Sequence, residues 1–198
     1  MNFDVSECEY GYRVSLFKDL EIRGRFIVTH VVFALSRTPQ PKLEYGHLAE
    51  AVEAAAASLS AVTPALIRKV IIKIRKEKLP EPSVMGSAGS FFKNPVISAE
   101  HFSKIEVGAK AEHGPDFKVP HYELPDGTVK VPAAWMIEQC GWKGRRSGGA
   151  AVYDKQPLVI VNYTGDAYPE EIIGLERRII ESVKSKFGVE LHPEVDHI

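Results

Sequence analysis

Residues 86–95, GSAGSFFKNP, gather several residue types that could do chemistry within ten positions. The two glycines allow the backbone to approach a ligand closely, and Ser90 places a hydroxyl at the rim of the segment. We expect Phe91 and Phe92 to anchor the segment in the core, while Lys93 and Asn94 add hydrogen-bond donors. Such a segment could hold an anion or present a serine for chemistry. The alternative is a plain Gly/Ser turn between a helix and a strand, and the residues alone favour neither interpretation.

Histidines and cysteines do not form a metal or redox motif. His192 and His197 are close in sequence, but no third ligand accompanies them, so we expect no metal site. Cys8 and Cys140 lie outside any CxxC or CxxH pattern. Two lone thiols are typical of a reducing compartment, which predicts a cytoplasmic protein.

Composition narrows the class of protein. The chain has 198 residues, of which 44% are hydrophobic and 26% charged, as in a globular protein with a real core. A formal net charge of -1 gives no bulk field for nucleic acid or an anionic membrane, so neither is an expected partner. The apolar runs are too short to span a bilayer, and the acidic N-terminus does not read as a secretory signal.

The first half of the chain shows a strand, a loop and two helices. Residues 25–35 are rich in β-branched and aromatic side chains and predict a buried strand. Residues 36–46 contain two prolines and predict a loop, and the alanine-rich residues 47–59 predict a helix. Thr63 caps a second predicted helix that Pro64 opens and that continues to residue 78. We expect its apolar stripe to face the core; the stripe comprises Leu66, Ile67, Val70, Ile71 and Ile74.

The second half mixes strands and helices without regular alternation. Residues 108–130 carry turn signals, residues 132–140 predict a short helix, and residues 157–162 predict a buried strand. A long amphipathic helix opens at Pro169 and closes at Gly188, and residues 189–195 predict a final strand. This order indicates an α+β fold, with a mixed sheet packed against helices.

The string GSAGSFFKNP, taken whole, resembles the signature loop of the UDP-N-acetylenolpyruvoylglucosamine reductase family. Further segments match that family in the same order and extend the resemblance over nearly the whole chain. They are CEYGYRVSLFK (8–18), PKLEYGHL (41–48), RKEKLPEP (75–82), AAWMIEQCGWKG (133–144), GGAAVYDKQPLVIVN (148–162) and VELHPEV (189–195).

The resemblance implies an activity and three catalytic residues. The family reduces UDP-N-acetylglucosamine enolpyruvate to UDP-N-acetylmuramate for peptidoglycan synthesis, with hydride relayed from NADPH through FAD. Ser90 matches the family's proton donor, whereas Arg13 and Glu194 match the residues that flank the enolate intermediate. An arginine fork suits a carboxylate, and a glutamate beside an enolate helps only if burial raises its pKa. Outside the motifs, Arg13 and Glu194 would read as ordinary surface residues.

The resemblance also implies a set of substrate-binding residues. Tyr45 matches a tyrosine on a loop that closes over the substrate, and Arg75 and Lys78 match basic positions near the diphosphate. Asn94, Tyr122 and Gln156 match positions that contact the uridine diphosphate sugar. By themselves, Arg75 and Lys78 would be solvated cations at a helix end, and Tyr122 a packing residue.

The expected organisation follows from the same resemblance. Residues 1–40 correspond to the end of the FAD-binding region, 41–190 to the substrate-binding domain, and 191–198 to a return segment that carries the glutamate. Most of the flavin region would lie upstream, on the same or a separate chain, so this chain alone would be inactive. The alternative function is a non-catalytic fragment that binds UDP-sugars without flavin. Asp196 and His197 depart from the family's arginine and aromatic residue, and Val14 stands where an acid is common.

Overall fold

A computed structural model describes residues 1–11, 14–22, 24–44, 47–56 and 62–195. The chain divides into two compact units, Met1–Lys42 and Leu43–Ile198, and each is considered by itself. Arg13 and Tyr45, two of the residues singled out in the sequence, lie outside the described residues.

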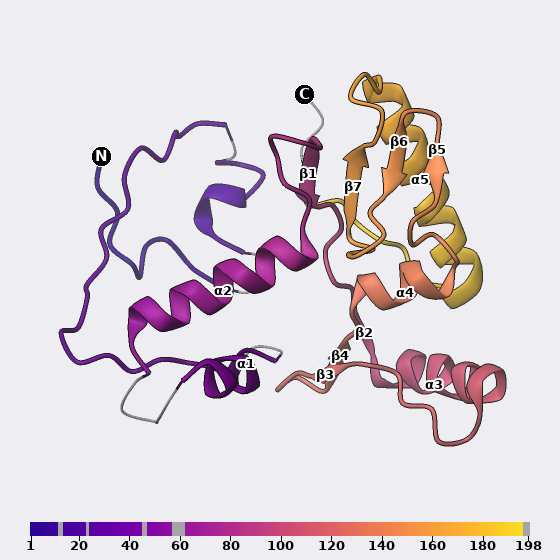
Figure 1. The fold of residues 1–198 in the computed structure, drawn as a ribbon, viewed down its shortest axis with the longest axis horizontal. Coiled ribbons are helices and arrows are strands. Elements are labelled where there is room, and N and C mark those ends of the chain that lie inside the picture. The colour runs from indigo at the N-terminus through magenta and orange to yellow at the C-terminus, as the bar shows by residue number, and fades with distance from the viewer. Residues whose placement is uncertain (12–13, 23, 45–46, 57–61, 196–198) are drawn as a thin grey trace. The chain divides into compact units, whose positions relative to one another are not determined.

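The second unit contains a four-stranded antiparallel sheet with the strand order β1-β7-β6-β5 (Figure 1). Its strands are β1 (Ser87–Ser90), β5 (Arg146–Ser147), β6 (Ala150–Val152) and β7 (Val159–Asn162). β6 and β7 are its buried centre, since only Asn162 among their residues is more than slightly exposed. β1 is an edge strand and is exposed along its whole length.

A smaller antiparallel sheet has the order β2-β4-β3. Its strands are β2 (Val96–Ser98), β3 (Tyr122–Glu123) and β4 (Thr128–Lys130). The Asp126 carboxylate accepts a hydrogen bond from Thr128 N, and Gly127 adopts a φ of 78° in the turn between β3 and β4. All strand pairs among the described residues are antiparallel. The α+β class is confirmed, but two antiparallel sheets replace the mixed sheet that we expected.

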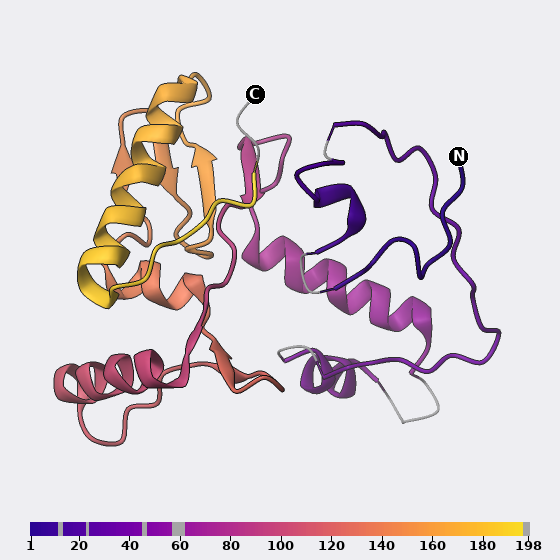
Figure 2. The ribbon, with the colours of Figure 1, turned by 180° about the vertical axis from the view of Figure 1, so that it is seen from behind.

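Helix α5 (Pro169–Phe187) lies across the four-stranded sheet, as the rear view in Figure 2 shows. Leu175, Ile179 and Val183 are fully buried along its inner face, and burial of such a side chain contributes about 1.5–3 kcal/mol. Gly188 ends the helix in the left-handed conformation (φ 67°), which only glycine adopts without steric cost. Both predicted ends of this helix are confirmed.

Helices α1 (Leu48–Ala55) and α2 (Pro64–Lys78) pack against each other. The Thr63 hydroxyl accepts a hydrogen bond from Leu66 N at 3.2 Å, so the predicted cap of α2 is confirmed. The expected core face is only partly formed, because Val70 alone in α2 is buried and Ile71 is 37% exposed. In the described residues, α1 is the helix that covers α2, and it is too short to bury the whole stripe.

In the sequence, one further helix lies between β2 and β3 of the small sheet and another follows β4. Helix α4 (Ala133–Gln139) confirms the short helix predicted there, and it contributes Met136 and Ile137 to the core. Helix α3 (Ala99–His113) was not predicted, and its last turn includes part of the segment 108–130 that we read as turns. Ser98 caps α3 by accepting a hydrogen bond from His101 N.

Two predicted strands are not present as strands. Residues 25–35 form no helix or strand, and Ile27, Val32 and Leu35 are each at least 88% exposed. A strand needs neighbours that accept and donate its backbone hydrogen bonds, and the described part of the first unit supplies no sheet. Residues 189–195 form only one isolated bridge, between Pro193 and Phe92.

The described part of the first unit contains one short 3-10 helix, Leu16–Lys18, and a cluster of aromatic rings. The rings of Phe3, Phe17 and Phe26 meet edge to face, with centroids 5.3–6.4 Å apart. None of the helices among the described residues is both long and apolar enough to cross a membrane.

Candidate functional site

Strand β1 carries Ser90 at the exposed edge of the larger sheet. The pairing of β1 with β7 changes register between Ser87 and Ser90, and Gly89 adopts a φ of 73° at this irregularity. A bulge at a sheet edge redirects the side chains that follow it. Phe91 and Phe92, each only 2% exposed, then fix the end of the strand in the core, as we expected. The segment is thus an edge strand rather than a plain turn.

The C-terminal segment runs beside the residues that follow Ser90. Lys93 N donates to His192 O at 2.9 Å, and Glu194 N donates to Phe91 O at 2.8 Å. These hydrogen bonds bring Glu194 next to the strand that presents Ser90, although 104 positions separate them in the sequence. Glu194 is half-buried, and its Oε2 atom is shielded from solvent. The structure therefore brings together two of the three residues that the sequence singled out as catalytic.

A cavity of about 330 Å³ lies between the end of α2 and β1. Arg75, Ser87 and Gly89 line it, together with Val159 of β7. Pro80, two residues after the end of α2, lines the cavity as well. This geometry places an exposed guanidinium beside the glycine-containing strand.

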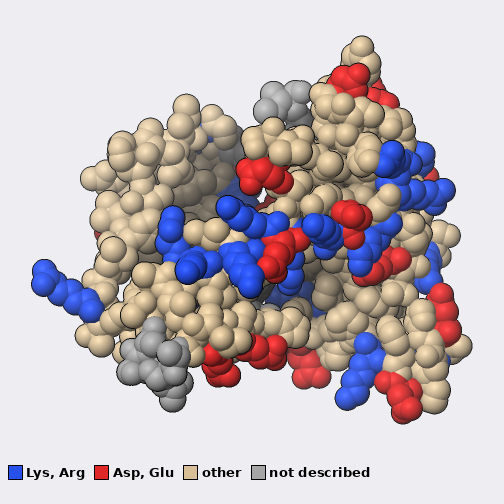
Figure 3. Space-filling model, in the orientation of Figure 1, with Lys and Arg blue, Asp and Glu red and all other residues tan. Residues whose placement is uncertain are grey.

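Helix α2 is strongly basic near this cavity. It carries six lysine or arginine residues and one glutamate, and three of the basic residues (Arg75, Lys76 and Lys78) fall in its last turn. In Figure 3, blue side chains gather over the position that α2 has in Figure 1. Among the described residues, neither Arg75 nor Lys78 forms an ion pair with a carboxylate. Lys78 is exposed and does not line the cavity.

Gln156 lies in the turn that leads into β7, beside the end of β1. Its side-chain oxygen accepts from Leu158 N at 3.4 Å, and its carbonyl accepts from Val159 N at 2.9 Å. Leu158 O in turn accepts from Phe91 N at 2.7 Å. The turn is therefore tied to the residue next to Ser90.

Asn94 has a structural contact that the sequence did not predict. Its Oδ1 atom accepts from Ala133 N at 3.0 Å and so caps the first turn of α4 from a distant part of the chain. The side chain is half-buried. The Asn94 amide nitrogen and the second lone pair of Oδ1 are the groups left for a ligand contact.

Tyr122 belongs to the small sheet and does not line the cavity that Arg75 shares with β1. It is 58% exposed and stands opposite Lys130 in the pairing of β3 with β4. The Lys130 ammonium lies 5.0 Å from the centroid of the Tyr122 ring. The sequence analysis did not single out Lys130. The Asp126-Gly127 turn could have indicated it, because a hairpin at this turn pairs Lys130 with Tyr122.

The described residues do not fit a dinucleotide cofactor through a glycine-rich turn. Such turns open a helix whose N-terminus faces the diphosphate. Here residues 86 and 89 flank or lie in an edge strand, and residues 148–149 join β5 to β6. We therefore derive no step through FAD or NADPH from these side chains.

Comparison with known proteins identifies the class of protein to which the α+β unit belongs. Residues 81–198 match the family model for the C-terminal domain of a reductase. The family is UDP-N-acetylenolpyruvoylglucosamine reductase, and the chain belongs to it.

Curated relatives extend the likeness over almost the whole chain. The chain is 46% identical over 196 residues to the reductase of Bacteroides fragilis, 43% over 198 to that of Porphyromonas gingivalis, and 44% over 192 to that of Burkholderia vietnamiensis. These alignments cover 97–99% of this chain but only 52–55% of the relatives. The chain thus spans about half the length of the curated relatives that it matches.

Proposed function

We propose that this chain supplies the substrate-binding and proton-donating part of an oxidoreductase. The reaction is the reduction of UDP-N-acetylglucosamine enolpyruvate to UDP-N-acetylmuramate in peptidoglycan precursor synthesis. One observation carries the proposal: Ser90 stands at an exposed edge strand, with Glu194 hydrogen-bonded alongside and with a cavity next to it that Arg75 lines. Family membership supplies the identity of the substrate.

The proposed chemistry assigns a proton to Ser90. Reduction of the enolpyruvyl double bond adds hydride to one carbon and leaves negative charge that spreads into the carboxylate. Ser90 Oγ–H protonates the other carbon. Glu194, which the family resemblance assigns to the enolate, lies alongside because its backbone N–H donates to Phe91 O. Arg13 is proposed as the second group at the enolate, from the family resemblance alone.

The substrate's anionic and sugar groups are assigned to separate elements. Arg75 and Lys78, at the basic end of α2, hold the diphosphate, for which helix-end cations without carboxylate partners are well suited. Gln156 and Asn94 contact the nucleotide sugar from the residues around β1, and Tyr122 does so from the small sheet. Tyr45 is proposed to close over the bound substrate.

The proposal assigns a different role to each region of the chain. Residues 1–40 belong with a flavin-binding region, residues 41–190 bind the substrate, and residues 191–198 return the glutamate to the site. FAD and NADPH are proposed as the cofactors from the family resemblance; FAD would supply the hydride, and we assign most of its binding site to a region outside this chain. We further propose that the protein acts in the cytoplasm, without nucleic-acid or membrane partners.

A second candidate function is a UDP-sugar-binding fragment without catalysis. The observation that favours it is the lack of a glycine-rich turn at a helix N-terminus among the described residues. The two candidates share the substrate cavity and differ only in turnover.

Two measurements, made one after the other, test the proposal. The first is calorimetric titration of the chain with UDP-N-acetylglucosamine, using wild type, Arg75→Ala, Lys78→Ala and, as a matched control on the same helix, Arg68→Ala. We expect each of the first two changes to weaken binding about tenfold, as for loss of a charge-assisted contact of about 1.4 kcal/mol. Binding that is unaffected by both changes, or equally weakened by Arg68→Ala, contradicts the assignment of the diphosphate site.

The second measurement addresses turnover. The upstream half of the Bacteroides fragilis relative is joined to this chain, and NADPH oxidation is followed with the enolpyruvyl substrate. Substrate-dependent oxidation supports the reductase. Saturable binding without turnover, despite bound flavin, supports the non-catalytic fragment.

A further inference from the structure

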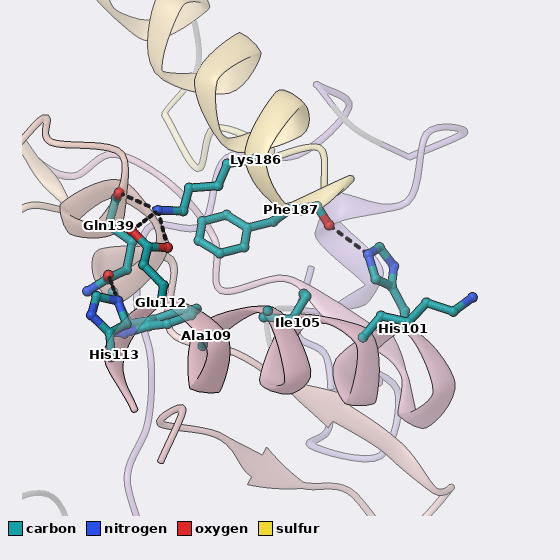
Figure 4. Close-up of a pocket in the computed structure, with 11 residues that line it drawn as sticks. His101, Ile105, Ala109, Glu112, His113, Gln139, Lys186 and Phe187 are labelled. Atoms are coloured by element: carbon teal, nitrogen blue, oxygen red, sulfur yellow. Dashed lines mark hydrogen bonds and ion pairs between the residues drawn. The ribbon is translucent and has the colours of Figure 1, made fainter. Parts of the chain in front are cut away.

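A larger cavity lies away from the proposed substrate site, between α3 and the C-terminal end of α5 (Figure 4). Its volume is about 480 Å³, within the range of small-molecule sites. None of its lining residues is among those that the sequence singled out. They are His101, Lys104, Ile105, Gly108, Ala109, Glu112, His113, Trp135, Gln139, Lys186 and Phe187.

The walls of this cavity are apolar and aromatic. Ile105 and Ala109 form its floor from α3, and the Phe187 ring faces them in Figure 4. The Trp135 ring stands 5.3 Å from that of Phe187, at an interplanar angle of 42°. A flat ring suits such walls, because aromatic pairs favour offset or tilted contact.

Gly108 leaves open space along the floor. A Cβ atom at this position would meet no other atom within 4 Å, although the residue lies in the middle of α3. Lys104 stands one turn earlier on the same helix, so its side chain lies on the same face as this space.

Fixed polar contacts close one end of the cavity. Lys186 Nζ pairs with Glu112 Oε2 at 2.9 Å and donates to Gln139 O at 3.1 Å, while His113 Nε2 donates to Gln139 Oε1 at 2.8 Å. The hydrogen bond from the Lys186 ammonium holds the pKa of Glu112 below its usual value, which favours the carboxylate at neutral pH. At the other end, His101 Nε2 donates to Phe187 O at 2.7 Å.

Lys104 is the lining cation that can pair with an anionic ligand. Its only ion pair among the described residues is with Glu100, and both side chains are more than 70% exposed. Exposed pairs of this kind are weak and exchange readily. Glu100 itself does not line the cavity.

We propose that this cavity binds a small planar aromatic carboxylate, with its ring over Gly108 against Phe187 and its carboxylate at Lys104. The lining carries two lysines against one glutamate, so an anion is favoured over a cation. Such a site lies outside the proposed catalytic residues, and its occupancy does not depend on the proposed reaction.

The test titrates the whole chain with 2-naphthoate and, as the uncharged counterpart, 2-naphthalenemethanol, followed by amide chemical shifts in NMR. We expect saturable binding of naphthoate in the range of about 1 mM or tighter, with shifts centred on α3 and the end of α5. Gly108→Leu fills the open space and should weaken binding of both probes at least about tenfold. Leucine is a better helix former than glycine, so α3 should persist.

Gly174→Leu is the matched control, because Gly174 is also a helical glycine with nothing near its Cβ position, but it lies outside the cavity. Lys104→Met should weaken naphthoate while leaving the alcohol unchanged. The proposal is overturned if naphthoate fails to saturate, or if a folded Gly108→Leu variant binds like wild type. Equal losses for Gly108→Leu and Gly174→Leu would also overturn it.

Discussion

Ser90 owes its position to its two neighbours in the chain, Gly89 and Phe91. Gly89 takes a left-handed conformation that shifts the register of the edge strand, and Phe91 locks the strand's end in the core. Phe91 also accepts the hydrogen bond that brings Glu194 alongside. A serine placed this way is held by backbone geometry, so its side chain can change without a loss of the strand.

Replacement of Ser90 by alanine should therefore separate chemistry from folding. In the chimaera that carries the upstream half of the Bacteroides fragilis relative, we expect product formation to fall about 10²–10⁴-fold, the usual contribution of a positioned proton donor. Reduction of the flavin by NADPH should continue at the wild-type rate. Stopped-flow absorbance distinguishes the two half-reactions, and Ser103→Ala, an exposed serine on α3, is the control. Product formation near the wild-type rate in Ser90→Ala would remove the serine from the mechanism.

The Glu171 carboxyl group gives a prediction about how the stability of the fold depends on pH. Its carboxylate accepts hydrogen bonds from Gly149 N and Tyr168 N, both at 2.9 Å, and these lower the pKa of Glu171. A carboxyl group whose pKa is lower in the folded state stabilises the fold above its unfolded-state pKa, and this contribution is lost as the pH falls through the folded value. Glu171→Gln should thus lower the melting temperature at pH 7, and the difference from wild type should shrink on acidification below about pH 4. Thermal melts from neutral to acidic pH test this, and a difference that grows on acidification would contradict it.

At the scale of elements, helix α2 links the fold to the proposed diphosphate site. Thr63 caps the start of the helix, and Arg75 and Lys78 occupy its last turn. Because Val70 is its only fully buried residue, α2 depends more than α5 does on its cap.

Thr63→Ala should loosen α2 without unfolding the unit. The change removes the acceptor of Leu66 N, and an N-cap of this kind contributes about 1 kcal/mol. We expect faster hydrogen exchange at the amides of α2, unchanged exchange in β6 and β7, and weaker binding of UDP-N-acetylglucosamine. Thr63→Ser keeps the hydroxyl and is the control. Exchange in α2 that matches wild type would show that the cap contributes little.

Sequence patterns predicted the elements whose signals are local. The caps of α2 and α5 and the apolar stripe of α5 mark those helices clearly. Helix α3 was missed although Ser98, Glu100 and Gly114 mark its ends, because the glycine and proline signals near residue 115 dominated our interpretation. Strand β1 could not be predicted, since its exposed residues become a strand only by pairing with β7, about 70 positions later. The hydrogen bond from Glu194 N to Phe91 O is likewise a non-local contact, and only the family resemblance, not a local pattern, led us to expect Glu194 near Ser90.

At the scale of the whole chain, the apolar core belongs to the second unit. The larger core cluster of buried residues runs from Phe91 to Leu191 and includes Val152 and Ile160 of the sheet and Leu175 of α5. In the first unit, Cys8 is the one hydrophobic residue that is buried among those described. Residues 25–35 there expose a run of β-branched and aromatic side chains.

Residues 43–198 should consequently fold without the first unit. We expect this shortened chain to unfold in urea with the same midpoint as the full chain, followed by the fluorescence of Trp135 and Trp142, both of which lie in the second unit. It should also bind UDP-N-acetylglucosamine with similar affinity, because Arg75, Lys78 and Gln156 all remain. Removal of residues 25–35 from the surface should improve solubility, since exposed apolar β-rich segments promote aggregation. A midpoint lower by more than about 1 M urea, or a broad non-cooperative transition, would show instead that the core of the second unit relies on residues 1–42.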